Sequence, residues 1–179
     1  LDGPLESGDE GYEFLLAVAG RYGVRGDLHD RATQTELLRR VDIVPVGLAL
    51  AQAANESAWG TSRFAREGNN LFGHWTWDKS VGMLPRDRDA GATHYVRVFP
   101  DIRRSVRAYL HNLNVGGAYR RLRKLRAGMR SAGQPLDPLV LAGALDGYSE
   151  RGGAYVNDIR AMIRSNGLAQ LNDLALGDR

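Results

Sequence analysis

Apolar residues recur at helical spacing along most of the chain, which predicts a mainly α-helical protein. Residues 11–23 place apolar side chains three and four positions apart, as one face of an amphipathic helix does. Thr33–Glu36 has the pattern of a capping box, which predicts a short helix that ends near Val41. A third helix is predicted over 45–58, with Pro45 in its first turn, where proline is tolerated.

The second half of the chain continues the helical pattern, and caps or glycines bound most of its elements. Aspartate is a favoured N-cap, proline is common at the first helical position, and glycine commonly ends a helix. On these signals we predict helices over 102–113 after Asp101, a basic helix after Gly116-Gly117, a helix from Asp137-Pro138 to Gly147, and a last helix over 153–165.

The helical pattern stops between residues 74 and 98. Glycines, Pro85 and several charged residues predict a loop there, and Thr93–Phe99 alternates and is rich in β-formers. We therefore expect a mainly α (α+β) protein in which a helical body carries a small β-hairpin lobe. Because connections are short, a single domain is predicted over 1–179, with its core at about 40–168 and N-terminal helices in 1–40.

Composition excludes several functional classes. The chain has no cysteine, so it has neither disulfides nor thiolate metal ligands, and its four histidines lack metal-ligand spacing. We expect no metal and no cofactor. The formal charge is +3, and the basic stretch Tyr119–Arg126 carries leucines at helical spacing, which predicts an amphipathic helix with a solvated basic face. No nucleic-acid partner is expected, because no nucleic-acid-binding module is present.

One carboxylate stands out against its surroundings. The predicted helix 45–58 is apolar on nearly every side, so we expect it to be central, yet Glu56 lies in its last turn. Burial and the negative end of the helix dipole both favour a neutral carboxyl group. A glycosidase needs such a group to protonate a leaving oxygen, and Trp59 is a candidate apolar wall beside it. The alternative is that Glu56 caps a helix or pairs on the surface with Arg63 or Arg66.

The residues around Glu56 resemble a known family. Ala49–Ser62, followed by Gly68–Gly73, is similar to the bacterial glucosaminidase domain, glycoside hydrolase family 73, whose members hydrolyse peptidoglycan. Asn69–Trp75 and Val106–Asn114 look most like its Bax-like branch. Asp146–Ser149, with Tyr155-Val156 downstream, resembles the closing tyrosine motif of the family. The resemblance covers about residues 40–168.

The resemblance implies a lysozyme-like fold and cleavage of the β-1,4 bond after N-acetylglucosamine. It implies that Glu56 is the catalytic acid and that Tyr148 holds the sugar N-acetyl group or the reacting water. The family often has a second carboxylate in a Thr-x-Glu pattern, where this chain has Thr93-His94-Tyr95. Asp87 and Asp89 are therefore the candidate bases, with Asp78 the only other acid in the insert, unless the N-acetyl oxygen of the substrate assists instead.

Aromatic and amide side chains near this motif are candidate sugar contacts. Rings can stack on the apolar faces of sugars, and amides can hydrogen-bond their hydroxyl groups. One of Trp75 and Trp77 is expected to face the groove and the other the body. The predicted substrate-binding residues are Asn69, Asn70, Phe72, Trp75, Trp77, Tyr95 and Tyr155.

Two alternatives stay open for the function. A lytic transglycosylase has the same fold and can work with one glutamate, and a cell-wall binding domain with decayed catalysis would also explain the missing hairpin carboxylate. In every case the expected partner is the glycan strand of peptidoglycan, bound by a monomer. Because the sequence begins at Leu1, we expect a processed or trimmed product, with any signal or membrane anchor outside this sequence. The peptidoglycan substrate that the resemblance implies predicts an exported protein of the periplasm or cell envelope.

Overall fold

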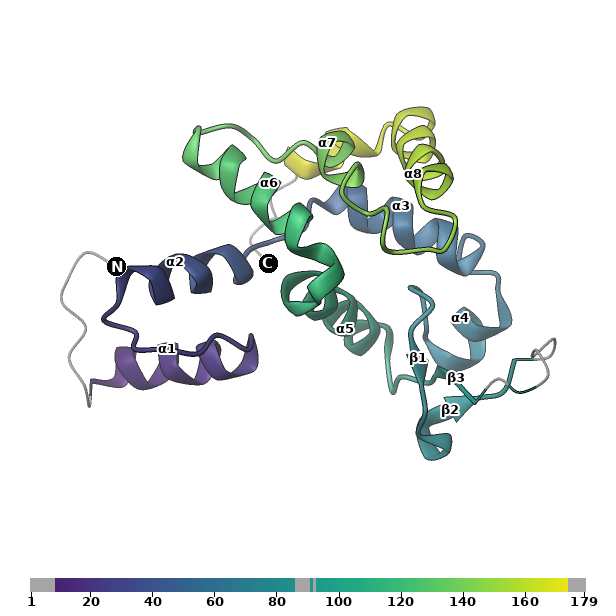
Figure 1. Cartoon of the computed structure of the whole chain (residues 1–179). Coiled ribbons are helices and arrows are strands. Elements are labelled where there is room, and N and C mark those ends of the chain that lie inside the picture. Colours follow the sequence, from purple (N-terminus) through teal and green to yellow (C-terminus); the bar gives the residue numbers. More distant parts are fainter. Residues whose placement is uncertain (1–8, 86–90, 92, 174–179) are drawn as a thin grey trace, which may run out of the picture.

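Eight α-helices and a small antiparallel sheet make up the part of the chain that the computed structural model describes, residues 9–85, 91 and 93–173 (Figure 1). This confirms the predicted mainly helical, lysozyme-like fold with a small β lobe. The helices are α1 (Glu10–Arg21), α2 (Arg31–Arg40), α3 (Val46–Ser57), α4 (Arg63–Gly68), α5 (Ile102–Val115), α6 (Arg120–Ser131), α7 (Pro138–Ala142) and α8 (Gly153–Ser165).

Helix α3 is packed into the main hydrophobic core, as its composition predicted. It contacts α7, α8 and the 3₁₀ segment Leu168–Asp173, and its Leu48 and Ala51 are fully buried. Leucines and isoleucines of α5, α6 and α8 complete this core. The helix is not enclosed on every side, however, because Val46 and Leu50 remain exposed.

The β lobe has three strands rather than the two of a simple hairpin. Strand β3 (Tyr95–Arg97) lies in the middle, between β1 (Trp75–Thr76) and β2 (Gly82–Met83), and both pairings are antiparallel. The β-forming stretch 93–99 thus supplies the central strand. The sheet and the short helix α4, which the sequence analysis did not predict, lie together at one end of the molecule (Figure 1).

Two helix boundaries differ from the prediction. Helix α2 begins at Arg31 after Asp30, so Thr33 is buried in the first turn instead of capping it. Glu36 does not reach back to a cap, because its carboxylate binds Arg39 and Arg40 at 3.0 and 2.7 Å. Helix α7 ends at Ala142, five residues before the predicted stop at Gly147.

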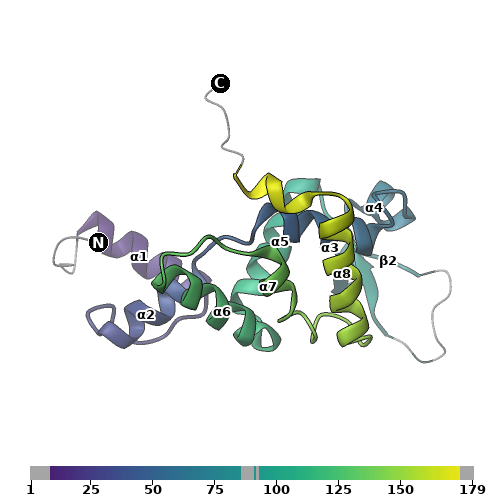
Figure 2. The ribbon, with the colours of Figure 1, turned by 90° about the horizontal axis from the view of Figure 1, so that it is seen from above.

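Helices α1 and α2 form a pair with a small hydrophobic cluster of their own, made of Ala19, Val24, Leu28 and Leu37. This pair lies at the end of the molecule opposite the sheet, as both views show (Figures 1 and 2). Helix α2 also contacts α6. The link between the pair and the main core therefore runs through the α2–α3 connection and α6, and also through His111 of α5, whose Nε2 lies 2.9 Å from the carbonyl oxygen of Arg21.

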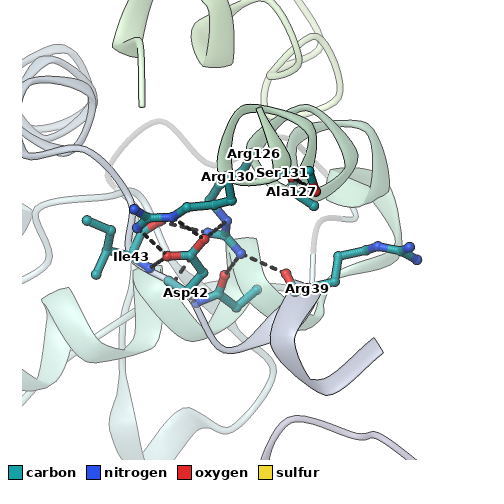
Figure 3. A network of polar contacts seen from close by, with 8 residues as sticks. Arg39, Asp42, Ile43, Arg126, Ala127, Arg130 and Ser131 are labelled. Atoms are coloured by element: carbon teal, nitrogen blue, oxygen red, sulfur yellow. Dashed lines mark hydrogen bonds and ion pairs between the residues drawn. The ribbon is translucent and has the colours of Figure 1, made fainter. Parts of the chain in front are cut away.

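Buried arginines of α6 hold this connection, which corrects the expectation of a fully solvated basic face. Arg126 is 0% exposed, and its guanidinium donates to the carbonyl oxygens of Ile43 and Arg39 at 2.9 and 3.0 Å (Figure 3). It also donates to Oδ1 of Asn114 at 2.7 Å. Arg123 is buried too, and donates to two carbonyls at the end of α5. Backbone acceptors explain why these cations are tolerated inside.

Asp42 adds an anion to the same network. Its carboxylate lies 3.4 Å from Nε of Arg126 and 2.9 Å from Nη2 of Arg130. Burial alone would raise the pKa of Asp42, but hydrogen bonds from Arg130 and from the Ile43 backbone, with the charge of Arg126, hold it below its ordinary value.

Within the described ranges, no helix has the length and apolar character needed to cross a membrane.

Candidate active site

A groove of about 770 Å³ opens between the helical body and the β lobe, and Glu56 lies in it. This volume is typical of ligand-binding clefts. The end of α3, the turn before β1, α5 and the loop before α8 all contribute to its wall. The lining residues are Glu56, Phe72, Gly73, His74, Trp75, His94, Asn112, Tyr119, Tyr148, Ser149, Glu150 and Arg151.

Glu56 is half-buried in the last turn of α3. Its Oε1 accepts a hydrogen bond from the amide of Asn55 at 3.3 Å. Gly73 stands next to the other oxygen: its φ is +67°, and a Cβ there would lie 3.3 Å from Oε2 of Glu56. A side chain at residue 73 would therefore crowd the carboxylate as well as strain the backbone.

The alternative surface roles of Glu56 do not match the observed contacts. Arg63 pairs with Glu67 at 3.7 Å and donates to the carbonyl of Leu84, while Arg66 is exposed on α4. Trp59 does not form the predicted wall, because it is 61% exposed and lines a different pocket. The apolar side of the carboxylate comes instead from the aromatic rings of the groove.

Three tyrosines surround the carboxylate. Burial raises the pKa of Tyr148, Tyr119 and Tyr155, and the charge of Glu56 raises each of them further. All three phenols are therefore neutral hydrogen-bond donors at ordinary pH. The hydroxyl of Tyr148 donates to the carbonyl of Phe72 at 3.1 Å, which places it on the groove wall as predicted for an active-site tyrosine.

Trp75 lies on the rim of the groove and Trp77 does not. Trp75 is 55% exposed and stacks on His94 with ring centroids 4.0 Å apart and planes 13° from parallel. Trp77 is 70% exposed, so the expectation that one of the two rings faces the body is wrong. The strand covers only Trp75–Thr76, and residues two apart on a strand point to the same side in any case. Phe72 is buried and stacks on Tyr109 with ring centroids 4.0 Å apart. It therefore contributes little exposed surface to the groove that it lines.

The two asparagines predicted to bind sugar instead hold the turn before β1. Asn70 is buried, donates to the carbonyls of His74 and Arg97, and accepts from the His74 backbone. Its amide is thereby fully used by the protein. Asn69 adopts a left-handed conformation at the end of α4 and donates to the carbonyl of Phe99 at 2.9 Å. Neither residue lines the groove.

Two further predicted residues, Tyr95 and Tyr155, also lie away from the groove wall. Tyr95 belongs to β3 opposite Thr76, and its side chain packs against Gly82, where a Cβ would come within 2.5 Å of it. Tyr155 is 1% exposed and lies behind Glu56, so it offers no surface to a substrate. Asp87 and Asp89, the predicted bases, lie outside the described residues.

Several groove residues were missed by sequence reasoning. Tyr119 was assigned to the basic helix, and Asn112 and Ser149 lie within recognised motifs but were not singled out. Glu150 and Arg151 lie outside every motif. His74 also lines the groove, and burial, aided by the charge of Arg97, lowers its pKa and keeps it neutral at pH 7. Glu150 is the second carboxylate on the wall among the described residues. No group of three His, Asp or Glu side chains in that part of the chain is arranged to hold a metal ion.

The turn after Glu56 has a strained backbone, which leads to a testable prediction about stability. Ala58 and Trp59 have φ of 50° and 57°, in the left-handed region that disfavours side chains by about 1–2 kcal/mol per residue. Ala58→Gly should raise the free energy of unfolding by about 0.5–1 kcal/mol in urea denaturation, since part of the gain is offset by the unfolded chain. Ala54→Gly, within α3, is the control and should lower it by about 1 kcal/mol. A loss of stability in Ala58→Gly would contradict the strain.

The groove combines a half-buried carboxylate, neutral phenol donors and an exposed aromatic ring. A glycosidase uses groups of these kinds to bind a sugar and protonate its leaving oxygen. Residues 32–168 match the glucosaminidase family, described as mannosyl-glycoprotein endo-beta-N-acetylglucosaminidase. The match covers most of the chain, so the chain belongs to this family of glycoside hydrolases, as its motifs predicted.

The comparison with individual proteins agrees with the Bax-like branch. The chain is 37% identical over 153 residues to "Protein bax" of Escherichia coli (strain K12). The aligned region covers 85% of this chain and 54% of that protein, so the chain spans about half the length of the relative it matches. No solved structure gives a significant match.

Proposed function

We propose that this chain hydrolyses the β-1,4 bond after N-acetylglucosamine in the glycan strands of peptidoglycan, with Glu56 as the general acid. The observation that carries the proposal is the position of Glu56, half-buried in a groove of about 770 Å³ whose wall includes the neutral phenols of Tyr119 and Tyr148. Family membership and the similarity to Protein bax support a glycosidase acting on cell-wall polysaccharide.

In this mechanism Glu56 donates its proton to the glycosidic oxygen as the bond to the anomeric carbon breaks. Tyr148 holds the N-acetyl group or the attacking water in this mechanism, and its position on the same wall as Glu56 supports that role. The base is Asp87, Asp89 or Glu150, or else the N-acetyl oxygen of the substrate. The product anomer, measured by NMR, narrows the choice: inversion requires a protein base, whereas retention requires either substrate assistance or a carboxylate that acts as a nucleophile.

Mass spectrometry of digested peptidoglycan tests the proposal. We expect fragments with hydrolysed N-acetylglucosamine reducing ends. Fragments ending in 1,6-anhydro-muramic acid would instead assign a lytic transglycosylase, which can work with Glu56 alone. Absence of any released fragment, with binding to the insoluble wall retained, would assign a binding domain. We further propose that the protein acts as a monomer outside the cytoplasm, where its substrate lies.

The contrast between Trp75 and Trp77 gives a prediction about substrate binding. Trp75→Ala removes the stacking surface at the groove rim and should raise KM for soluble glycan about five- to tenfold, the equivalent of about 1–1.5 kcal/mol. Trp77→Ala removes an equally large and more exposed ring away from the groove, and should leave KM unchanged. Equal effects of the two substitutions would contradict the assignment of the rim as a sugar platform.

A further inference from the structure

Behind the groove, three buried polar side chains from three helices form a continuous chain of hydrogen bonds. They are Gln52 of α3, Tyr109 of α5 and Tyr155 of α8, each at most 1% exposed. The hydroxyl of Tyr109 donates to Oε1 of Gln52 at 2.7 Å, and Nε2 of Gln52 donates to the hydroxyl oxygen of Tyr155 at 2.8 Å. Burying these groups is tolerated because each has a partner.

The direction of these bonds decides where the Tyr155 proton points. Because its oxygen accepts from Gln52, its own O–H is left to donate to a different acceptor. Gln52 and Glu56 are four residues apart on α3 and therefore share one face of the helix. The Gln52 amide therefore holds the Tyr155 hydroxyl on the face of α3 that carries Glu56. Burial raises the pKa of Tyr155, and the charge and hydrogen-bonding capacity of Glu56 raise it further. The phenol thus stays protonated, with Glu56 as the neighbouring acceptor for its proton.

We infer that Tyr155 is a positioning residue for the Glu56 carboxyl, and that the amide of Gln52 orients it. Tyr155 does not touch the substrate, since it lies behind the groove. Its ring also stacks on that of Tyr148, with centroids 5.5 Å apart and planes 7° from parallel. Tyr155 therefore supports two groove residues, Glu56 and Tyr148, from behind. This inference rests on the proposed function, because it assigns a role in the same reaction.

The hydrogen bond from Tyr155 stabilises the negative charge that develops on Glu56 during proton transfer. When Glu56 passes its proton to the glycosidic oxygen, it becomes a carboxylate, and a hydrogen bond to a charged acceptor is stronger than one to a neutral acceptor. The Tyr155 proton is not transferred; it remains on the phenol and stabilises the new anion. The buried amide keeps the hydroxyl in place, so little reorganisation is needed as the charge appears.

Tyr155→Phe tests this role, because the ring that fills the core is kept and only the hydroxyl is lost. We expect kcat on peptidoglycan to fall about tenfold with KM within about twofold, as for an interaction that strengthens in the transition state. The neutral acid would also persist to higher pH, so the alkaline limb of the activity profile should move up by about one pH unit. If the Tyr155 hydroxyl had only a structural role, its loss would not shift the alkaline limb of the activity profile.

Tyr109→Phe is the matched control. It removes a hydroxyl from the other side of the same Gln52 amide and should cost comparable stability, but it breaks no contact with Glu56. Its kcat and alkaline limb should stay close to those of the wild type. Equal shifts of the limb in both variants, or none in Tyr155→Phe, would overturn the inference.

A measurement without substrate separates this inference from the proposed function. With ¹³C-carboxyl-labelled glutamate, the NMR signal of Glu56, assigned by its absence in Glu56→Gln, can be titrated in wild type and in Tyr155→Phe. We expect a higher titration midpoint in the variant. An inactive wild type would overturn the proposed function alone, whereas equal midpoints would overturn the positioning role.

Discussion

Replacing Glu56 with glutamine is expected to reduce the release of reducing ends from peptidoglycan by about 10²- to 10⁴-fold, the usual contribution of a general acid. Glutamine has nearly the same shape as glutamate but has no acidic proton to give to the leaving oxygen. The hydrogen bond from Asn55 can still be accepted by the amide oxygen, so the end of α3 should keep its structure. The loss should appear in kcat more than in KM.

Glu67→Gln is the control for this experiment. Glu67 is exposed on α4, and its one recorded ion pair is with Arg63 at 3.7 Å, so the same chemical change there should leave turnover unchanged. Thermal unfolding of both variants should lie close to that of the wild type, because neither side chain is part of the core. Turnover retained in Glu56→Gln would remove the general acid from the proposed mechanism.

Replacing Arg126 with methionine is expected to lower the free energy of unfolding by about 3–5 kcal/mol, the range seen when one partner of a buried ion pair is removed. Methionine can fill much of the space but cannot donate hydrogen bonds. The carbonyls of Arg39 and Ile43 and the side chain of Asn114 would lose their buried donor. Urea denaturation of the full chain measures the change.

Arg130→Met is the matched control for Arg126→Met. Arg130 pairs with the same carboxylate, Asp42, at 2.9 Å, but about half of its side chain is exposed. Solvent screening limits such a pair, so we expect a loss of about 1 kcal/mol or less. Arg126→Lys keeps the charge without the planar fork and should fall between the two. A loss below about 1 kcal/mol in Arg126→Met would contradict the role assigned to the network.

Residues whose assignment depended on their own motif or helix position do line the groove. Glu56 lies in a groove at the end of an apolar helix, and Tyr148 faces that groove from the loop before α8. Trp75 was placed on the groove wall by its neighbourhood in the sequence. By contrast, Asn69, Asn70 and Tyr155 were assigned to the substrate because polar and aromatic groups near a catalytic motif suit sugar binding. Their hydrogen bonds to distant segments could not be read from that neighbourhood.

The basic helix shows the same limit in another part of the molecule. The spacing of its leucines correctly predicted an amphipathic helix, α6. Periodicity separates apolar from polar faces, but it does not say which arginines will meet backbone carbonyls of another segment. Arg123 and Arg126 are buried because the ends of α2 and α5 offer such acceptors, while Arg121 and Lys124 stay exposed.

By itself, the sequence determined the helical architecture, the family and the presence of a carboxylate at the end of α3, because periodicity, capping and motif spacing are local properties of the chain. Only the tertiary structure decided which side chains share the groove and which support it from behind. Tyr119, His94 and Asn112 reach the groove from three separate segments, and Gln52, Tyr109 and Tyr155 meet across three helices. Contacts between segments far apart in the chain depend on how the helices pack, and no local pattern records that packing.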